Sequence, residues 1–374
     1  MEYKEYELGE LLYYEQPTPY IVESTDYNDA YGTPVLTAGK SFILGYTDEK
    51  EGIYDQLPVI IFDDFTTASQ YVNFKFKVKS SAMKILTPVT ELVLPKYIYY
   101  RMQIINFDHS THKRYWIQQY SKIRVSVPPL PEQERIVARI EELFSQLDAG
   151  VETLKKTKAQ LAVYRQAVLK EAFSCCAEKK SIREMSSIVT SGSRGWAKYY
   201  CDNGAKFIRI GNLTRNKIYI DLDDIQHVQL PDKAEGTRTK LAPNDVLVSI
   251  TADLGSIGLV PNGIGEAYVN QHIAMIRFNN QMQGEFYAWY LRSEYGQQDL
   301  LRNKRGGGKL GLGLDDIRDS RVPVVSNETA ESILSIIECR LSVCDSIEHT
   351  VDLALQQAEA MRQSILKDAF EGRL

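Results

Sequence analysis

The sequence predicts an α+β fold in which two β-rich globular domains are separated by two long antiparallel α-helices that pair as a coiled coil, with a pseudo-twofold internal repeat. The first observation is the length of 374 residues, which predicts two or three domains at about 100–200 residues each. The second is that "RQAVLKEAF" at 165–173 recurs as "RQSILKDAF" at 362–370, an offset of 197 residues. The third is that each copy ends a long segment almost free of Gly and Pro. The chain is therefore a tandem duplication of one globular domain followed by one helix.

The first globular domain is expected over residues 1–130, where short apolar runs alternate with turn residues. The runs at 58–62 and 71–78 have the β-branched and aromatic content that is typical of strands. These features predict a β-rich domain that is large enough to bury a core of its own.

Three lysines alternate with apolar residues in and just after the second of these runs, namely Lys75, Lys77 and Lys79. A continuous strand here would present three ammonium groups on one face and bury the other face. Such a face could follow the phosphates of a nucleic acid, and the alternative is the solvated outer face of a sheet.

A heptad pattern runs through the first long helix, expected over 131–176, and in the same register through the second, expected over 327–374. A narrow apolar stripe of this kind buries against one partner helix, whereas two unrelated amphipathic helices need not share phase and length. At 1.5 Å per residue, about 44 residues make a rod of about 65 Å, which suits a spacer. The stripe in the first helix comprises Ile136, Ile140, Leu143, Leu147, Gly150, Leu154, Thr157, Leu161, Tyr164, Val168 and Glu171, and each position has a counterpart 197 residues later.

The ends of both helices carry recognisable signals. Pro131 stands in a first turn, where a missing N–H costs nothing. Ser326 or Asn327 can cap the second helix, and Gly372 can close it.

The second globular domain is expected over 177–326. Its alternating apolar runs at 205–210, 217–222, 245–250 and 272–278 predict strands, and a helical stretch at 284–302 precedes the second long helix.

Charge and composition restrict the class of protein. With 44 basic and 49 acidic residues the net charge is -5, so any surface that binds nucleic acid must be local; the segment 175–326 alone is net basic, with 20 basic and 17 acidic residues. No apolar run is long enough to cross a membrane, and the first residues do not resemble a secretory leader. Five cysteines in no regular spacing fit small buried apolar residues better than disulfides or a zinc site. The protein is therefore expected to be cytoplasmic, with no membrane partner.

Base reading requires side chains with paired donors and acceptors next to cations, and several segments offer them. Each candidate can equally be structural. The glycines in the basic run at 302–309 would let backbone N–H groups approach a phosphate, and the alternative there is an exposed loop. The candidates for DNA contact are Thr66, Lys113 and Arg114 with the three lysines in the first domain, and Arg194, Trp196, Lys198, Arg209, Asn212, Arg215, Lys217, the triplet Asn270-Gln271-His272, Arg302, Lys304, Arg305 and Lys309 in the second.

Signatures of catalysis are absent from the sequence. There is no P-loop, no His-Glu-x-x-His zinc motif, no Gly-x-Ser-x-Gly elbow and no aromatic Pro-Pro motif of an amino-methyltransferase. A Gly-x-Gly-x-x-Gly pattern at 306–311 follows a helical stretch where a dinucleotide site needs a strand, so it is read as chance. His109 and His112 are three residues apart, but no third metal ligand accompanies them. We expect a chain that is not an enzyme, holds no metal and uses no cofactor.

Over essentially its whole length the chain resembles the specificity subunits of type I restriction-modification systems. "PPLPEQERIVARIEELFSQLD" at 128–148 is similar to the start of the central helix of that family, and "RQSILKDAFEGRL" to its C-terminal end. "IRIGNLTRNKI", "NDVLVSITADLGSIG" and "VNQHIAMIR" resemble segments of its target recognition domain. "YGTPVLTAGKSFILGY" and "VIIFDDFTTASQYVNFKFKVKSSAMKIL" resemble a second variety of that domain.

This resemblance implies a non-catalytic subunit that recognises a bipartite, asymmetric target in double-stranded DNA, with one half-site per domain and the helix pair as a spacer ruler. It implies two methyltransferase subunits and two restriction (translocase) subunits as partners. Those partners, rather than this chain, would use S-adenosylmethionine, and ATP with Mg²⁺.

One departure from the family pattern and one rival function remain. Where the first copy has "PLPEQE", the second has "VVSNET" at 324–329, so the counterpart of Gln133 is lost and the contacts of that turn are in doubt. The alternative function is a coiled-coil scaffold that binds proteins and makes no DNA contact. A self-sufficient DNA enzyme is disfavoured by the missing motifs.

Overall fold

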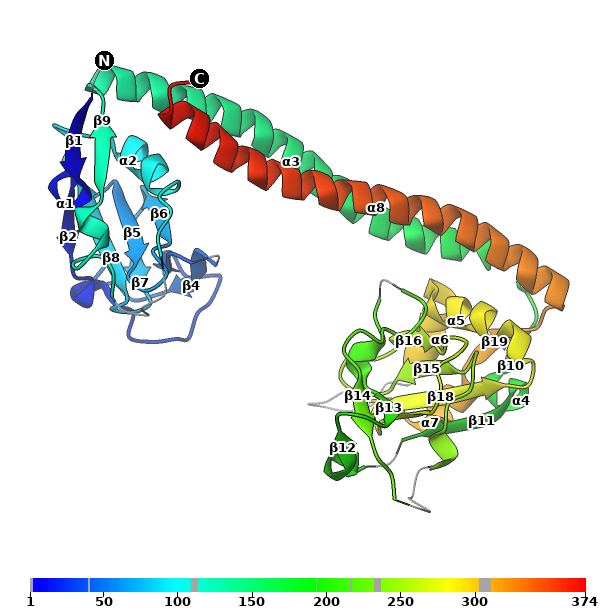
Figure 1. Ribbon diagram of the computed structural model, residues 1–374. Coiled ribbons are helices and arrows are strands. Elements are labelled where there is room, and N and C mark those ends of the chain that lie inside the picture. The colour runs from blue at the N-terminus through cyan, green and yellow to red at the C-terminus, as the bar shows by residue number, and fades with distance from the viewer. Residues whose placement is uncertain are drawn as a thin grey trace. The chain divides into compact units, whose positions relative to one another are not determined.

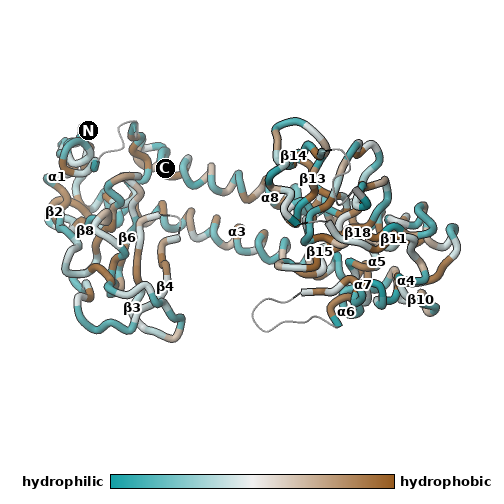
Figure 2. The backbone as a smooth tube through the Cα atoms, turned by 90° about the horizontal axis from the view of Figure 1, so that it is seen from below, coloured by the Kyte–Doolittle hydropathy of each residue, from teal (hydrophilic) through white to brown (hydrophobic). Residues whose placement is uncertain are grey.

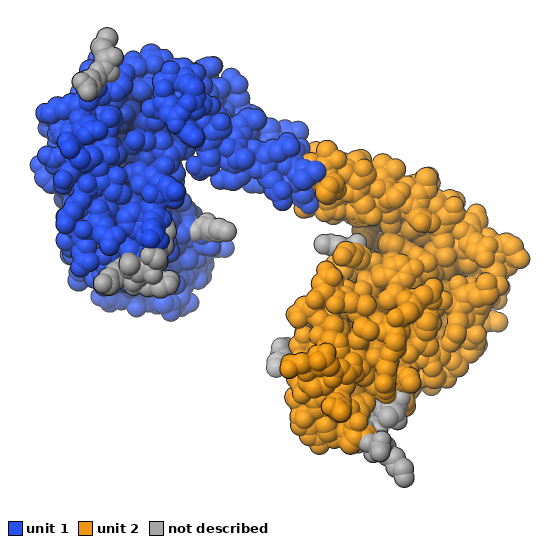
Figure 3. All heavy atoms as spheres, viewed as in Figure 1, with its two compact units in different colours: residues 1–155, 352–374 blue, residues 156–351 orange. Residues whose placement is uncertain are grey.

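The computed structural model describes residues 3–39, 41–108, 114–192, 194–215, 217–231, 237–302 and 311–374. The chain divides into two compact units (Figure 3): unit 1 consists of residues 1–155 and 352–374, and unit 2 of residues 156–351. Each unit contains one β-rich domain and a part of each long helix (Figure 1).

The domain in unit 1 is built from three small sheets. The largest is antiparallel, and in the second β7 runs parallel to β3. In order across each sheet, the strands are β2 (Leu12–Glu15), β8 (Met83–Pro88), β5 (Val59–Asp63) and β6 (Ser69–Val72); β4 (Ile43–Thr47), β3 (Thr33–Leu36) and β7 (Lys77–Val78); and β1 (Lys4–Glu7) with β9 (Arg124–Val127). Its helices are α1 (Leu8–Leu11), α2 (Pro95–Met102) and the 3-10 turns η1 (Thr18–Tyr20) and η2 (Tyr120–Lys122).

Strand β5 shows why a continuous apolar run was needed in this domain. Val59 and Ile61 point into a core shared with Phe76, while Ile60 and Phe62 point into a second core shared with Tyr97. Because side chains alternate along a strand, a strand that is covered on both faces must be apolar at every position. The second core also contains residues of the long helices, so the domain and the helices of unit 1 fold as one body.

The domain in unit 2 has three sheets as well. In order, the strands are β11 (Ser186–Ser191), β18 (Ile273–Phe278), β15 (Val246–Ser249) and β16 (Ile257–Leu259); β12 (Tyr200–Cys201), β14 (Gln226–Val228), β13 (Ala205–Ile208) and β17 (Ala267–Val269); and β10 (Lys179–Ser181) with β19 (Arg321–Pro323). Its helices are α4 (Ile182–Met185), α5 (Gly284–Arg292), α6 (Glu294–Leu301) and α7 (Leu314–Asp319), with the 3-10 turns η3 (Trp196–Tyr199), η4 (Ile210–Asn212), η5 (Thr237–Thr239) and η6 (Gln281–Gln283).

The two domains share one topology although their sequences differ. The sheet β2-β8-β5-β6 corresponds strand for strand to β11-β18-β15-β16 in chain order and pairing. In both domains a second sheet contains one parallel pair, β3 with β7 and β13 with β17. The predicted α+β class and the internal repeat are therefore confirmed.

Helix α3 (Leu130–Ala172) and helix α8 (Asn327–Phe370) run antiparallel. In unit 2, Arg340 pairs with Glu171 at 2.5 Å and Arg165 with Asp345 at 2.6 Å, so later residues of one helix meet earlier residues of the other. In unit 1, Arg362 pairs with Asp148. These two Arg–Asp pairs are related by the 197-residue offset, and they confirm the predicted helix pair. Figure 2 shows many hydrophilic residues along both helices and hydrophobic residues gathered in the strands.

The predicted heptad register is correct at most positions, including Ile136 and Ile140 at the start of α3, and wrong at Gly150, Tyr164 and Glu171, which are exposed. Leu161 and Val168 are buried and Leu147 is half-buried, as expected, and so is the buried Val351 of α8. At these three positions the residue that turns inward lies one place further along the chain: Tyr164 is 48% exposed, whereas the Arg165 side chain is only 23% exposed.

The same shift occurs in α8, where Met361 is 53% exposed and the Arg362 side chain 29%. The aliphatic parts of three charged side chains lie between the helices, and their charged groups lie at the edge of the helix contact and form ion pairs. These residues are Arg165, Glu348 and Arg362. Because these residues are polar in sequence, the apolar pattern there indicates the neighbouring residue instead.

The ends of the long helices follow the sequence signals. The Ser326 hydroxyl accepts a hydrogen bond from the N–H of Thr329 at 3.2 Å, so Ser326 is the cap, and Gly372 has a φ of 73°. At the start of α3 the buried Gln133 side chain accepts a bond from the N–H of Leu94 at 2.8 Å. It donates to the carbonyls of Leu92 and Pro128, at 3.0 and 2.8 Å.

In the second half, where the counterpart of Gln133 is missing, a residue of the domain takes over this contact. The buried Gln283 donates to the carbonyl of Val325 at 3.2 Å and to Asn327 Oδ1 at 2.9 Å. The glutamine that ties the domain to the long helix therefore comes from the helix in the first half and from the domain in the second half. We call each of these attachments of a domain to its long helix a joint.

Three predicted elements need correction. The run at 71–78 is not one strand, because β6 ends at Val72 and the chain rejoins a different sheet as β7. The run at 217–222 forms only an isolated bridge from Tyr219 to Leu259, since its buried residues serve two different cores. The stretch at 284–302 is two helices, separated at Ser293, whose hydroxyl accepts the N–H of Gly296.

Candidate nucleic-acid interface

The turn between β5 and β6 is an ordered turn at the surface of the first domain. The Asp63 carboxylate accepts hydrogen bonds from the N–H groups of Phe65 and Thr66, both at 2.9 Å, and Thr67 has a φ of 55°. This local network holds the turn in one conformation and leaves Phe65 and Thr66 exposed at its tip.

A buried ion pair between Lys84 and Asp64 lies next to this turn. Lys84 Nζ lies 3.5 Å from Asp64, and both side chains are at most 2% exposed. Asp64 also accepts the N–H of Trp116 at 2.8 Å, which ties the segment after residue 114 to the turn. Burial lowers the pKa of Lys84, and the charge of the exposed Arg114 lowers it further. The structure thus joins the segment that follows Arg114 to the turn that carries Thr66, while Lys113 lies outside the described residues.

Lys84 was missed in the sequence, although a single lysine within the apolar run 83–86 is a signal of a buried pair. Its ammonium group also donates to Gln16 Oε1 and to the Ser81 carbonyl, both at 3.0 Å. Asp64 and Lys84 are therefore fixed groups under the candidate contact residues, rather than contact residues themselves.

The predicted row of three lysines does not form. Lys75 is exposed and lies 3.5 Å from Asp55, and Lys79 is exposed as well. The Lys77 side chain is 5% exposed, pairs with Glu49 at 2.5 Å and donates to the Glu51 carbonyl at 2.8 Å. The prediction of one cationic face is wrong for Lys77, because the strand is interrupted between β6 and β7.

In the second domain, two candidate segments that are 60 residues apart line one cleft. This cleft, of about 500 Å³, is bounded by Arg209, Asp223 and Asp224 on one side and by Asn270 and His272 on the other. Arg209 lies 3.9 Å from Asp224, and the two present a donor and an acceptor at the protein surface. Arginine and carboxylate are the groups that recognise guanine and cytosine edges.

The His272 residue is held by three polar contacts. Its Nδ1 lies 2.8 Å from Thr251 Oγ1, its Nε2 lies 2.8 Å from Gln271 Nε2, and its N–H donates to Asn270 Oδ1 at 3.1 Å. These contacts hold the ring at the cleft in a single orientation.

Asn212 and Trp196 are structural, contrary to the prediction. The Asn212 amide is buried, accepts the N–H of Arg209 at 2.8 Å and donates to the Asp221 carbonyl at 2.9 Å, so its hydrogen bonds are used within the protein. Trp196 is buried and stacks on Phe207 with ring centroids 5.4 Å apart. Both residues are needed to fold the loops that carry the neighbouring cations.

The other candidate cations of the second domain are exposed where the structure describes them. Arg194 and Lys198 flank Trp196, and Arg302 ends α6. Arg215 pairs with Asp253 at 2.5 Å, and Lys217 lies 4.0 Å from Asp221. The candidates Lys304, Arg305 and Lys309 lie outside the described residues, as do His109 and His112 and most of the 306–311 glycine pattern.

No group of three or more metal-ligating side chains occurs among the described residues. None of the described helices is long and apolar enough to cross a membrane. All five cysteines are free; Cys176 and Cys344 are buried as expected, but Cys175 and Cys339 are exposed because they lie on the outer side of the helix pair or just after it.

Comparison with known proteins agrees with this geometry. The family described as the type I restriction modification DNA specificity domain matches residues 1–162 and 177–357. The type I restriction enzyme EcoR124I/EcoR124II specificity subunit of Escherichia coli is 31% identical over 385 residues, covering 95% of this chain and 92% of that protein. The EcoBI specificity subunit of Escherichia coli is 26% identical, covering 66% of this chain and 58% of its own length.

A solved structure described as the structural basis of complex assembly and conformational transition of the type I R-M system has the same fold. It matches with a TM-score of 0.70 and 16% identity, covering 100% of this chain and 98% of that chain. The chain therefore belongs to the type I restriction modification DNA specificity family, as the sequence predicted, and its role is that of the non-catalytic subunit that recognises the DNA target.

Proposed function

We propose that each β-rich domain reads one half of a bipartite, asymmetric DNA target, and that the helix pair sets the number of unread bases between the halves. In this proposal residues 1–130 and 177–326 are the two reading domains, and residues 131–176 and 327–374 form the spacer. The observation that carries it is that one strand order occurs twice in the chain while the exposed polar residues differ between the copies.

The corresponding hairpins illustrate this difference. The β5–β6 turn and the β15–β16 turn both contain a non-glycine residue with positive φ, Thr67 at 55° and Ala252 at 59°. The first turn exposes Phe65 and Thr66, whereas the second places Asp253 against Arg215 and Thr251 against His272. Two domains that share a strand order but expose different side chains at the corresponding turns are suited to two different half-sites.

The residues we propose for DNA contact are the exposed cations and polar groups of each domain. Phosphate contacts would position the domains, and groups at the cleft and the turn would read bases. They are Thr66, Arg114, Lys75 and Lys79 in the first domain, and Arg194, Lys198, Arg209, Arg215, Lys217, His272 and Arg302 in the second.

The long helices also expose apolar side chains that suit partner subunits. Val163, Val343 and Leu353 are 71%, 56% and 45% exposed, and they are among several apolar side chains that the long helices leave exposed. The relatives are named as subunits of restriction enzymes, so we propose that methyltransferase and restriction subunits dock on these helices. S-adenosylmethionine, and ATP with Mg²⁺, would be bound by those partners, in the cytoplasm.

A domain exchange tests the assignment of half-sites. Residues 1–130 are replaced with those of another family member, the chain is produced with its methyltransferase subunit, and methylated adenines are mapped across a genome. We expect one half of the target to change and the other half to be retained. A change in both halves would contradict the assignment.

Two measurements on the unaltered complex and a point variant complete the test. DNA affinity should fall steeply with salt, because phosphate contacts release counterions, whereas a protein-binding scaffold shows no such slope. Arg209→Gln should relax the sequence preference in the half read by the second domain by about 1–3 kcal/mol. The matched control is Arg183→Gln. It removes the same single positive charge, but from an arginine that is paired with Asp315 and Asp319.

A further inference from the structure

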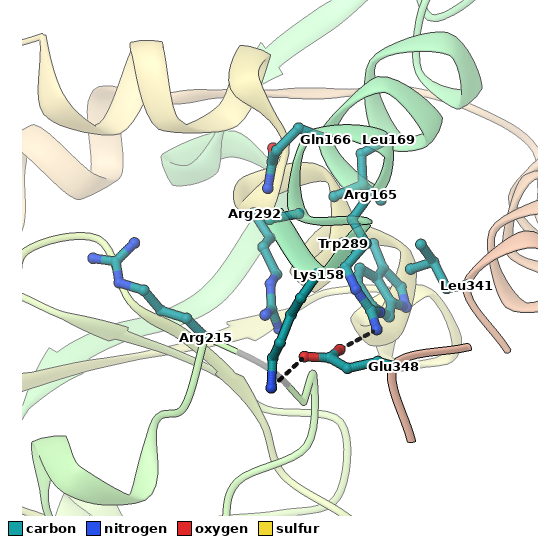
Figure 4. Close-up of a pocket in the computed structure, with 10 residues that line it drawn as sticks. Lys158, Arg165, Gln166, Leu169, Arg215, Trp289, Arg292, Leu341 and Glu348 are labelled. Carbon is teal, nitrogen blue, oxygen red and sulfur yellow. Dashed lines mark hydrogen bonds and ion pairs between the residues drawn. The ribbon is translucent and has the colours of Figure 1, made fainter. Parts of the chain in front are cut away.

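A basic pocket in unit 2 lies where the second domain meets the helix pair. It encloses about 230 Å³ between α3, α5, α8 and the loop after η4. Lys158 and Arg165 of α3, Arg292 of α5 and Arg215 of the loop line it, together with one acid, Glu348 of α8 (Figure 4). The pocket therefore has an excess of three positive charges over its own lining acid.

Three of the four cations have acidic partners. Glu348 lies 2.9 Å from Arg165 and 3.7 Å from Lys158, as the dashed lines in Figure 4 mark. Arg165 also pairs with Asp345, and Arg215 pairs with Asp253 outside the pocket.

Arg292 has no acidic partner among the described residues. Its guanidinium donates one hydrogen bond, to the Lys217 carbonyl at 2.8 Å, and lies 5.6 Å from the centre of the Trp289 ring. Burial, together with the positive charges of Arg165 and Arg215, lowers the pKa of Arg292 to about 10. The Arg292 guanidinium stays charged at neutral pH, although its surroundings disfavour the charge. An anion in the pocket would provide the negative partner that Arg292 lacks.

The first half of the repeat shows that the helix pair packs without the charges of Lys158 and Glu348, although it keeps the counterpart of Arg165 as Arg362. By the 197-residue offset, Lys158 corresponds to Leu355, Glu348 to Val151, and Leu341 of the pocket wall to Phe144. In unit 1, Phe144 packs edge-on against Tyr100 at 5.7 Å, and Arg362 lies 4.7 Å from the centre of the Phe144 ring.

The equivalent joint in unit 1 is thus filled with aromatic rings, and the joint in unit 2 is open and cationic. The pocket is smaller than the sites of about 300–1,000 Å³ that hold drug-sized ligands, so it fits one small anion. Guanidinium groups match the oxygens of a phosphate through paired hydrogen bonds. We propose that this pocket binds one phosphate group, and that a phosphate of the DNA backbone occupies it when the target is bound. The DNA source of this phosphate rests on the proposed function.

The test uses the full chain in complex with its methyltransferase subunits and a duplex that contains the target. DNA affinity is measured against salt for the unaltered complex, for Arg292→Gln and for Arg215→Gln. Each variant should lose about tenfold in affinity at about 0.1 M salt, the effect of one charge-assisted hydrogen bond. The slope of log affinity against log salt should become shallower by about 0.9, the value for one phosphate contact.

The matched control is Arg183→Gln, which carries the same charge change in unit 2 and should leave the slope unchanged. Arg215 is largely exposed, so Arg215→Gln retains the test if Arg292→Gln does not fold. If neither pocket variant alters the slope more than Arg183→Gln does, the phosphate contact is refuted while DNA binding itself stands. If the unaltered complex shows no salt-dependent DNA binding, it is the proposed function that fails.

A second measurement separates the sources of the phosphate. The unfolding midpoint of the full chain is compared in inorganic phosphate and in chloride at equal ionic strength, without DNA. Stabilisation by phosphate that is lost in Arg292→Gln, together with an altered salt slope, supports a pocket that takes the DNA backbone. Stabilisation with an unaltered slope refutes the DNA source in favour of free phosphate. Loss of methyltransferase binding with both readouts intact refutes the phosphate and indicates an acidic protein side chain.

Discussion

Lys77 and Glu49 form an ion pair that sits under the edge of the three-stranded sheet of the first domain. Glu49 accepts hydrogen bonds from Lys77 and from the N–H groups of Ser24 and Glu23, the latter two at 3.0 Å. These donors, with Lys77 first, lower the pKa of Glu49 below its ordinary value. A lysine that the sequence placed among DNA contacts therefore stabilises the fold.

This pair predicts a specific dependence of stability on pH. Because the pKa of Glu49 is lower in the folded than in the unfolded chain, its contribution is complete above the unfolded value of about 4.3 and is lost as the pH falls through the folded value. Glu49→Gln should cost about 1–2 kcal/mol at neutral pH, and the difference should disappear towards about pH 3. Calorimetric unfolding of the full chain between about pH 3 and 7 measures it.

Glu51→Gln is the control, since the Glu51 side chain is exposed and only its carbonyl meets Lys77. We expect this variant to follow the unaltered chain at every pH. A constant deficit of Glu49→Gln that persists through the acid range would show that the carboxylate charge is not what stabilises the sheet.

At the scale of elements, the decisive feature is how each domain is attached to a long helix. Both attachments use one buried glutamine, but Gln133 belongs to α3 and Gln283 to η6 of the domain. Each amide bonds backbone groups on the opposite side of its joint, so helix and domain keep a fixed orientation within their unit.

The attachment in unit 1 can be tested with Gln133→Leu. The change removes three hydrogen bonds and leaves the Leu94 N–H and two carbonyls without a partner. We expect a loss of about 2–4 kcal/mol in the stability of unit 1, because buried polar groups are left unsatisfied. Hydrogen exchange in peptides around residues 92–94 and at the start of α3 should accelerate.

Gln146→Leu on the exposed side of the same helix is the matched control and should stay within about 0.5 kcal/mol of the unaltered chain. Equal exchange rates in both variants would mean that the apolar contacts of Ile136 and Ile140 with the domain are sufficient alone.

At the scale of the whole molecule, the repeat makes the two halves of the helix pair equivalent. Residues 151–157 of α3 correspond to residues 348–354 of α8. Deleting both heptads keeps the phase of the contact stripe and shortens each helix by about 10 Å, close to the rise of three base pairs.

We expect the complex with both heptads deleted to prefer a target with a shorter spacer, as read from methylated adenines across a genome. Deleting only residues 151–157 leaves helices of unequal length and should abolish methylation. An unaltered spacer length after the double deletion would refute the ruler.

Much of the architecture was predictable because it depends on patterns within short segments of the sequence. The repeat at 165–173 and 362–370 established the duplication, and the absence of Gly and Pro established two long helices. The strand β5 was predictable from its unbroken apolar run, and the capping of α8 from Ser326. Each of these features depends on residues that are neighbours in the chain.

The candidate interface was predictable only in part. Arg209 and His272 were both named from the sequence, but their shared cleft depends on the parallel pairing of β13 with β17, the strand that leads into the segment of His272. Trp196 and Asn212 were assigned to DNA because their chemistry suits it, and the fold uses that same chemistry for a ring stack and for loop hydrogen bonds.

The sequence by itself determined the duplication, the helix pair, the α+β class and the family, because periodicity and motifs survive in a single linear segment. Only the tertiary structure decided which heptad positions carry Arg165 and Arg362, where Lys77 is buried, and that one joint is open and basic while the other is filled. The physical reason is that the burial of a long polar side chain is set by the groups it meets, and those groups come from distant parts of the chain.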